Sequence, residues 1–375
     1  MTGRRIYLDG NSLGPPSRGV GDALAAVVAH WEQSLIGGWN EGWWDLPVTV
    51  GDRIAPLLGA APGQVVVGDS TTVLWFKAVG AALRLRPDRP TVVTQAGGFP
   101  TDRHAIDALG APVAAVGPDE LAGALGPDTA VLAVTHVDYR TGRRLDMGAL
   151  TAAAHAAGAV AVWDLSHSVG AMDLHLDAHD VDLAVGCTYK YLNGGPGSPA
   201  FAYVAARHLP VLDQPLPGWV GHADPFSVSE VHEPAPGIRR MLSGTPPVLA
   251  LTVLDHALAR FDGVDPAALR VRSLELTDRF LAGTDALGLA TVTPRSHADR
   301  GSQVSLRHEH AWALTQALIE VGVVGDYRPP DLLRLGFPPL YVTDDDVDEA
   351  LARLAEVLRT DSWRPWVTAA RPTVT

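Results

Sequence analysis

The stretch "GCTYKYLNGGPGSPAF" spans residues 186–201 and places one lysine, Lys190, between an apolar run and a cluster of glycines and prolines. The chain contains only two lysines, Lys77 and Lys190, against 27 arginines. Lysine is normally among the commonest residues. The position of Lys190 therefore needs an explanation, which depends on the segments that surround it.

Apolar, β-branched segments alternate with alanine- and leucine-rich helical patterns along the first two-thirds of the chain. Helical patterns occur, for example, at 71–83 and 146–158. Strands that are apolar throughout and alternate with helices predict a buried, mostly parallel sheet with helices on both faces. In such sheets, ligands bind beyond the carboxyl ends of the strands. The predicted strands are residues 64–67, 91–94, 130–137, 159–163, 182–187 and 200–204.

The last third of the chain has a different pattern. After a helical segment at about 247–261 come the shorter strands "QVSL" and "DLLRLGF" and a final helix, for which Thr343 or an early aspartate can serve as N-cap. The sequence thus predicts an α/β protein with a smaller α+β domain at its C-terminal end. We expect three parts, namely an N-terminal segment (1–20) packed with the small domain, a large domain (21–250) and the small domain (251–375).

The composition of the 375 residues is globular, with 47% hydrophobic and 19% charged residues. The net charge of −13 argues against nucleic acid or an anionic membrane as the main partner. No run of about 18 apolar residues could form a membrane span, and no apolar signal region follows "MTGRR". The single cysteine, Cys187, excludes an internal disulfide framework, so we expect a cytoplasmic protein.

Two patterns suggest ligands but do not fit their context. "GGPGSPA" contains the dinucleotide fingerprint G-x-G-x-x-A, yet two prolines interrupt it and a predicted strand, rather than a helix, follows. His175 and His179 in "HLDAHDVD" have a spacing that suits a metal only on a helix, whereas the segment is predicted to be a loop. "HEHAW" (308–312) is equally weak, and we predict no metal site.

Three features converge at one end of the predicted sheet. Thr71 and Thr72 begin a helix, where free backbone N–H groups favour a phosphate, although simple N-capping also explains these hydroxyl residues. Asp164 ends a buried strand and needs a cationic partner, either an arginine or a protonated heteroaromatic nitrogen. Lys190 follows the next strand. Together these features describe a pyridoxal-phosphate site.

Lys190 is the predicted Schiff-base lysine of that site. A lysine amine is a nucleophile only when it is unprotonated, and an apolar, glycine-tight pocket favours that form. Lys77 is the competitor, but it lies within a helical pattern beside Phe76 and Ala78 and lacks the glycine-rich approach.

Three of the ten tryptophans lie within six residues in "GWNEGWWDLP" (38–47). Packing in the core or at a subunit interface is the default explanation for such a cluster. The alternative is an aromatic wall for an aromatic substrate.

Along nearly its whole length the chain resembles the kynureninase family of fold-type-I pyridoxal-phosphate enzymes. "YKYLNGGPG" alone would indicate only the wider aminotransferase-like superfamily, whereas the ordered set of motifs is specific. The resemblance implies the fold-type-I fold, a pyridoxal 5'-phosphate cofactor and a homodimer with shared active sites. The motifs are "YLDGNSLG", "GWNEGWWDLP", "GDSTT", "GGFPTD", "THVDYRTG", "WDLSHSVGAMDLHL", "GCTYKYLNGGPGSP", "GWVGH", "SGTPP" and "GDYRPPDLLRLGFPPLY".

The resemblance also implies roles for individual residues at the cofactor. Lys190 would hold the cofactor covalently, Asp164 would pair with its ring nitrogen beside His167, and Tyr189 is a candidate acid–base. Phe99 would stack on the ring. Trp219 and Thr245 would contact the phosphate from the partner subunit. The implied cofactor-binding set is Thr71, Thr72, Phe99, Pro100, Thr101, Asp102, Thr135, Asp164, His167, Tyr189, Lys190, Trp219 and Thr245.

At the substrate, the resemblance implies that Arg334 pairs with the α-carboxylate, a bidentate task that suits a guanidinium. Ser12 and Trp39 would line the substrate end. The implied reaction is hydrolytic Cβ–Cγ cleavage of L-kynurenine or 3-hydroxy-L-kynurenine in tryptophan catabolism or a related biosynthetic route. Thr245 stands where some members carry asparagine, at a position that bears on ring-hydroxylated substrates, so both substrates stay open.

Three rival functions share this fold. A cysteine desulfurase or lyase needs a cysteine on a mobile loop, whereas Cys187 ends a predicted buried strand three residues before Lys190. An aminotransferase is the second rival. A catalytically silent homologue is the third, and the complete set of Lys190, Asp164, His167 and Arg334 argues against it.

Overall fold

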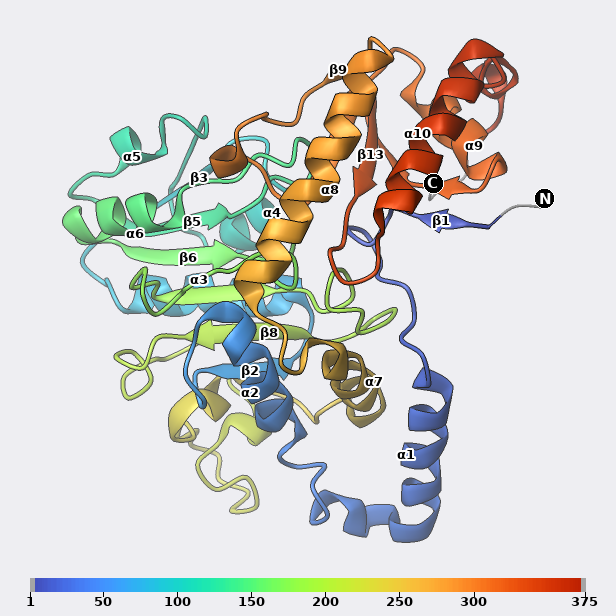
Figure 1. Ribbon diagram of the computed structural model, residues 1–375. Coiled ribbons are helices and arrows are strands. Elements are labelled where there is room, and N and C mark those ends of the chain that lie inside the picture. Colours follow the sequence, from blue (N-terminus) through green and yellow to red (C-terminus); the bar gives the residue numbers. More distant parts are fainter. Residues whose placement is uncertain (1–3, 372–375) are drawn as a thin grey trace.

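A seven-stranded sheet forms the centre of the computed structural model, which describes residues 4–371 (Figure 1). The strand order is β2-β8-β7-β6-β5-β3-β4. All neighbouring pairs are parallel except the two that β8 makes with β2 and β7. The strands are β2 (Val65–Gly68), β3 (Thr91–Gln95), β4 (Val113–Val116), β5 (Thr129–Thr135), β6 (Val160–Asp164), β7 (Leu183–Gly186) and β8 (Ala200–Val204).

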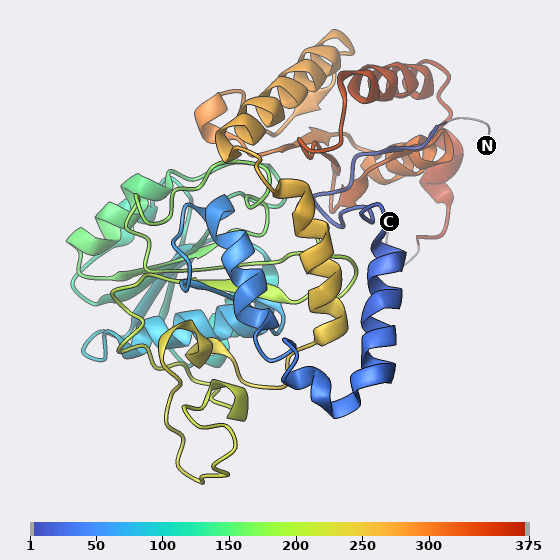
Figure 2. The ribbon, with the colours of Figure 1, turned by 60° about the horizontal axis from the view of Figure 1, so that its bottom comes forward.

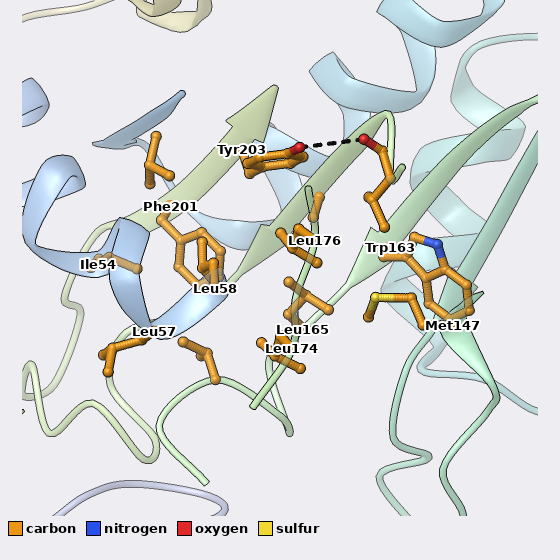
Figure 3. Close-up of a cluster of buried hydrophobic side chains, with 14 of the residues drawn as sticks. Ile54, Leu57, Leu58, Met147, Trp163, Leu165, Leu174, Leu176, Phe201 and Tyr203 are labelled. Carbon is orange, nitrogen blue, oxygen red and sulfur yellow. Dashed lines mark hydrogen bonds between the residues drawn. The ribbon is translucent and has the colours of Figure 1, made fainter. Parts of the chain in front are cut away.

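Both faces of this sheet are buried, which confirms the predicted α/β architecture. In β5, Leu132 and Val134 join one apolar cluster while Val131 and Ala133 join the cluster on the opposite face. Alternate residues of a strand point to opposite faces, so burial on both sides demands apolar residues throughout. Figure 3 shows part of the first cluster, where Phe201 packs near residues of α2.

Helices cover the two faces of the sheet. The first cluster includes residues of α2 (Leu46–Leu58), α6 (Met147–Ala156) and α7 (Val248–Leu258). The second includes residues of α3 (Thr71–Arg84) and α4 (Pro100–Ala108). A short helix, α5 (Leu121–Ala124), lies near the edge strand β4. The six predicted strands are all present, with bounds that differ from the prediction by at most two residues. β4 was missed because this edge strand is half-exposed and rich in alanine.

A smaller antiparallel sheet follows, in the order β12-β13-β10-β9. Thr343 is the N-cap of the last helix, and it forms a capping box with Asp346. The predicted alternative, capping by an early aspartate, is therefore not used. The elements are α8 (Pro266–Ala286), β9 (Ala290–Thr291), β10 (Gln303–Arg307), α9 (Ala311–Glu320), β11 (Val323–Val324), β12 (Asp326–Arg328), β13 (Leu332–Gly336) and α10 (Asp344–Arg359).

The N-terminal segment connects the small sheet to the large one. Strand β1 (Ile6–Tyr7) pairs in parallel with β11, and Ile6 and Leu8 are buried among the residues that cover the small sheet. The chain then passes the Lys190 loop, where the N–H of Gly14 donates to the carbonyl of Tyr189 (2.7 Å). Helix α1 (Val20–Ser34) continues beside α7 (Figure 2). Among residues 4–371, no helix has the length and apolar character needed to cross a membrane.

Candidate active site

The carboxyl ends of β5, β6 and β7 meet at one edge of the large sheet, and a cavity lies there. Thr135 and Asp164 face each other in register at the ends of β5 and β6. Lys190 lies on the loop after β7, as the sequence predicted. The residues that line the cavity are Thr71, Thr72, Gly98, Phe99, Thr101, Asp102, Thr135, Asp138, Tyr139, Asp164, Ser166, His167, Tyr189 and Lys190.

Lys190 contacts a buried histidine in this cavity. Its Nζ atom lies 2.9 Å from Nε2 of His167. The pKa of His167 is well below its usual value, first because of burial and then because of the charge of Lys190. The imidazole is therefore neutral near pH 7 and can accept a hydrogen bond from the amine. Burial also raises the pKa of the neighbouring Tyr189 hydroxyl, which keeps its proton available for donation.

Two of the three aspartates that line the cavity, Asp164 and Asp102, have raised pKa values, which makes the cavity receptive to a positive charge. Burial raises the pKa of Asp164, an effect that the charge of Lys190 opposes. Asp102 has a pKa well above its usual value because of burial and the nearby charge of Asp164. A cationic group between them would relieve both effects. The protonated ring nitrogen of pyridoxal phosphate is such a group.

The start of α3 supplies the phosphate-type feature of the site. Ser70 is the N-cap, and its Oγ accepts the N–H of Val73 at 3.4 Å. Capping therefore does not explain Thr71 and Thr72, which line the cavity at a helix end that favours an anion. Together with Lys190, the residues of this cavity fit pyridoxal phosphate.

Lys77, the only other lysine, has a structural role. Its side chain is fully buried, and Nζ lies 2.5 Å from Oδ2 of Asp69 and 3.0 Å from the carbonyl oxygen of Met241. A buried ammonium requires such partners. Lys77 is therefore committed to packing between α3 and the segment at Met241.

Arg334 lies beside the cavity without lining it. It is buried on β13, where Asp326 binds its Nε and Nη2 atoms and the carbonyl oxygen of Tyr139 accepts from Nη1 at 2.6 Å. Tyr139 itself lines the cavity and packs edge-on against Phe99. Arg334 is thus connected to the Lys190 cavity by its hydrogen bond to the backbone of Tyr139, a residue that lines the cavity.

Besides Arg334, five predicted residues do not line the cavity of this single chain, namely Pro100, Ser12, Trp39, Trp219 and Thr245. Pro100 is the first residue of α4, next to Phe99, which does line the cavity. Ser12 lies in the N-terminal turn two residues before Gly14, which contacts the Lys190 loop. Trp39 and Thr245 line a separate apolar hollow. Trp219 packs against Trp44, with ring centroids 5.5 Å apart. For Trp219 and Thr245, the resemblance implied a place in the cavity of a partner subunit.

Several residues around the cavity were not found from the sequence. Asp138 and Tyr139 lie in the motif "THVDYRTG", which was quoted for the family resemblance, but neither residue was assigned a role. Asp326 lies in the quoted motif "GDYRPPDLLRLGFPPLY" and Gln303 in the predicted strand "QVSL", but neither residue was assigned a role, since both belong to strands of the small sheet that are far from Lys190 in the sequence.

His175 and His179, weighed as metal ligands, lie on a loop, with ring centroids 6.3 Å apart. The stretch "GGPGSPA" is followed by β8, so it lacks the helix that the dinucleotide fingerprint requires. Neither pattern belongs to the cavity.

Comparison with solved structures defines the fold. The C-DES lyase, in a mutant with glycine covalently linked to its pyridoxal-phosphate cofactor, superposes with a TM-score of 0.81 at 17% identity, covering 94% of this chain and 97% of that one. A cysteine desulfurase from Thermococcus onnurineus gives 0.80 at 17%, covering 95% of each. A NifS-like protein gives 0.75 at 16%, covering 95% and 100%. The chain has the fold-type-I architecture of these enzymes.

Sequence comparison defines the family. The model of the kynureninase C-terminal domain matches residues 269–354. The chain is 49% identical to a kynureninase of Deinococcus radiodurans (96% of this chain, 91% of that one) and 45% identical to one of Pseudomonas fluorescens (96% and 90%). A kynureninase of Burkholderia pseudomallei is 44% identical (99% and 93%). With such identity over nearly its whole length, the chain belongs to the kynureninase family of pyridoxal-phosphate-dependent hydrolases that act on a carbon–carbon bond.

Proposed function

We propose that this chain cleaves the Cβ–Cγ bond of L-kynurenine or 3-hydroxy-L-kynurenine with water. The products are L-alanine and anthranilate or 3-hydroxyanthranilate. The observation that carries the proposal is the cavity in which Lys190, Asp164 and the start of α3 converge, in a chain 49% identical to a kynureninase.

The cofactor would be held by three of these features. Lys190 would supply the amine, Asp164 would pair with the ring nitrogen, and the α3 start with Thr71 and Thr72 would receive the phosphate. When bound, pyridoxal phosphate supplies the electron sink for bond cleavage at the substrate. The buried Asp164 carboxylate would favour a proton on the ring nitrogen, because a cation there would offset the desolvation of its charge.

Proton transfers fall to Lys190 and Tyr189. The Nζ atom of Lys190 takes the proton from the α-carbon of the substrate, and the neutral His167 holds that amine in place at 2.9 Å. Burial keeps the Tyr189 hydroxyl protonated, and this hydroxyl donates its proton to the β-carbon of the substrate when the Cβ–Cγ bond breaks.

Arg334 would bind the substrate carboxylate. A guanidinium has five N–H donors. The Asp326 carboxylate accepts the N–H of Nε and one N–H of Nη2, and the carbonyl oxygen of Tyr139 accepts one N–H of Nη1. One N–H on each Nη atom therefore remains for an incoming carboxylate. Asp326 thus orients the guanidinium before substrate arrives.

We also propose that two copies of the chain form a homodimer. Helix α1 buries only Val27, and Trp31, Leu35 and Ile36 are 53%, 62% and 80% exposed around the apolar hollow that contains Trp39 and Thr245. Such a continuous apolar surface is characteristic of an interface. A second copy on this face would bury it, and the family resemblance implies that Trp219 and Thr245 would then contact the partner's cavity.

The direct test is a product assay with the cofactor-loaded protein. We expect L-kynurenine or 3-hydroxy-L-kynurenine to yield alanine together with the fluorescent aromatic acid, and Lys190→Ala to yield neither. L-cysteine and an amino-acid/oxo-acid pair serve as controls for the rival reactions. Release of sulfide or transamination, without cleavage of either kynurenine, would contradict the proposal.

A further inference from the structure

Lys77, one of the two lysines of the chain, reaches back from α3 to the residue before the helix N-cap. Its Nζ atom lies 2.5 Å from Oδ2 of Asp69, and Asp69 is followed by the N-cap Ser70. Lys77 is about two turns inside the helix, and helical side chains tilt toward the N-terminus, so its amine can reach the helix start. The Lys77 side chain is fully buried, whereas the Asp69 side chain is 27% exposed. The buried ammonium is therefore the fixed member of this ion pair.

Asp69 has an uncommon backbone conformation. Its φ of 47° lies in the left-handed region, which residues with a Cβ seldom adopt, although aspartate tolerates it better than most. Asp69 turns the chain from β2 into α3, because Gly68 ends the strand and Thr71 begins the helix. Two contacts hold this turn, namely the ion pair with Lys77 and the Asp69 carbonyl oxygen, which accepts the N–H of Ala200 at 3.1 Å. The direction in which α3 starts depends on these contacts.

The carboxylate of Asp69 also has an electrostatic effect on the helix start. Thr71 and Thr72 line the Lys190 cavity at the helix end where the cofactor phosphate is proposed to bind. Asp69 lies only two positions before Thr71 in the chain, and an unpaired negative charge there would repel a phosphate. The ammonium of Lys77 offsets that charge. The free N–H groups and the dipole of the helix start can then attract an anion.

We propose that Lys77 is a positioning residue for the cofactor phosphate, because it holds Asp69 in the left-handed turn that starts α3 and neutralises the carboxylate beside the phosphate site. The inference rests on the proposed placement of the phosphate at Thr71 and Thr72. It assigns a task to each of the two lysines. Lys190 is the amine that would carry the cofactor, and Lys77 shapes the site that would receive its phosphate.

A second contact of Lys77 affects how the proposal must be tested. Nζ also lies 3.0 Å from the carbonyl oxygen of Met241, the last residue of the 3₁₀ helix η3 (Gly237–Met241). Removal of the amine would therefore weaken the packing of this segment as well as the turn at Asp69, since the carbonyl oxygen would lose this donor. The test must measure a quantity that depends on the phosphate alone.

That quantity is the preference of the full-length, cofactor-free protein for pyridoxal 5'-phosphate over pyridoxal. The two ligands share the ring and the aldehyde and differ in the phosphate group, so the ratio of their Kd values isolates the contribution of the phosphate. Both Kd values are measured by titration, from the absorbance of the bound ligand. We expect Lys77→Met to lower the preference at least about tenfold, the equivalent of one hydrogen bond to a charged group, and to change the Kd of pyridoxal less than about twofold.

Asp69→Asn is the conservative variant. Its amide oxygen can still accept from Nζ of Lys77, asparagine tolerates the left-handed turn, and the negative charge is gone. We therefore expect its preference for the phosphorylated ligand to stay within about threefold of the wild type or to exceed it. Val79→Ala is the matched control, because Val79 is a fully buried core residue of α3 that does not line the cavity. It should lower stability and leave the preference unchanged.

The proposal is overturned if Lys77→Met keeps the wild-type preference, or if it weakens the binding of both ligands equally. A loss in Asp69→Asn or Val79→Ala as large as that in Lys77→Met would overturn it as well. If Lys77→Met does not fold, the double variant Lys77→Met/Asp69→Asn, which leaves no unpaired carboxylate, is compared with Asp69→Asn. A preference lower by at least about threefold then supports the proposal, and an equal preference overturns it.

The wild type separates this inference from the proposed function. Wild-type protein that binds the two ligands equally well would contradict the placement of the phosphate at Thr71 and Thr72, and this inference with it. If the wild type prefers the phosphorylated ligand and Lys77→Met retains that preference, only the role of Lys77 is refuted, and the proposed function stands.

Discussion

Arg334 and Asp326 form a two-pronged ion pair within the small sheet, with Nε 2.8 Å from Oδ1 and Nη2 2.5 Å from Oδ2. Both side chains are almost completely buried, at 1% and 2% exposure. A planar guanidinium held on one edge by a carboxylate cannot rotate, so its remaining N–H groups point in a fixed direction. This pair is the structural basis of the first prediction.

Truncating Arg334 should lower kcat/KM for the substrate without affecting cofactor binding. We expect Arg334→Ala to lower kcat/KM by the equivalent of about 2–5 kcal/mol, the range for breaking a buried charge pair, while the visible absorbance of bound cofactor is unchanged. Arg334→Lys should recover only part, because the planar fork is lost. Arg328→Ala is the control, since Arg328 also pairs with Asp326 but is partly exposed. If Arg334→Ala has wild-type kinetics, Arg334 does not bind the substrate α-carboxylate, and Arg328 becomes the next candidate for that role.

Lys190 should be the residue that carries the cofactor. The purified protein should be yellow, and borohydride reduction followed by peptide mapping should place the cofactor on the Lys190 peptide. Lys77 is the built-in control, because it is the only other lysine and its amine is bound to Asp69. Cofactor found on Lys77 would refute the assignment of the whole cavity.

Asp164 should be needed for proton removal rather than for cofactor binding. Asp164→Asn keeps the size of the side chain but removes the charge that holds a proton on the ring nitrogen. We expect the variant to bind cofactor and to lose at least about 100-fold in the rate of α-proton exchange, measured by ¹H NMR of the substrate in D2O. Exchange at the wild-type rate would show that Asp164 has no such electrostatic role.

Asp9 should make the stability of the protein depend on pH. Burial and the neighbouring Asp326 raise the pKa of Asp9 to about 8, against the opposing charges of Arg334 and Arg328. Between pH 4 and pH 8 the folded chain therefore holds a proton at Asp9 that the unfolded chain lacks, so this contribution to stability falls as pH rises through that window.

Asp9→Asn replaces the protonated acid by a neutral amide. Its stability relative to the wild type should therefore increase between pH 5 and pH 8 by at least about 1.4 kcal/mol, the equivalent of one pKa unit. Urea unfolding at the two pH values measures the difference. Parallel stability curves for the two proteins would contradict the raised pKa of Asp9.

The exposed apolar surface at α1 should hold two copies of the chain together. Ile36→Glu places a charge at the most exposed apolar side chain beside the hollow, and we expect it to convert a dimer into a monomer in light scattering. Val271→Glu on α8 is the control, since Val271 is also an exposed aliphatic residue but lies outside the hollow. A wild-type protein that is monomeric at micromolar concentration would contradict the dimer.

Much of the fold follows from local patterns in the sequence. Segments such as "AVAVW" are apolar at every position, because β6 is covered on both faces, and this predicts the central sheet without knowledge of its neighbours. Asp164 and Lys190 could be assigned to one edge because strand ends of a parallel sheet meet there. The division into 1–20, 21–250 and 251–375 stays a prediction.

Other features depend on contacts between distant segments and could not be predicted from patterns. The resemblance implied that Trp39 lines the substrate end, yet its place in the exposed hollow depends on how α1 packs beside α7. Gln303 and Tyr139 are 164 positions apart in the numbering, and only the packing of the small sheet against the Tyr139 turn brings the Gln303 amide to the Tyr139 carbonyl oxygen.

Composition and periodicity thus determine which residues are buried and where Lys190 lies, because burial on two faces and strand-end placement are local consequences of the residue pattern. The orientation of the reactive groups is a tertiary property. Asp326 faces Arg334 because β12 and β13 pair antiparallel in a register that sets these two residues opposite each other. A shift of one residue in that register would point the Asp326 side chain to the other face of the sheet and leave the arginine unheld.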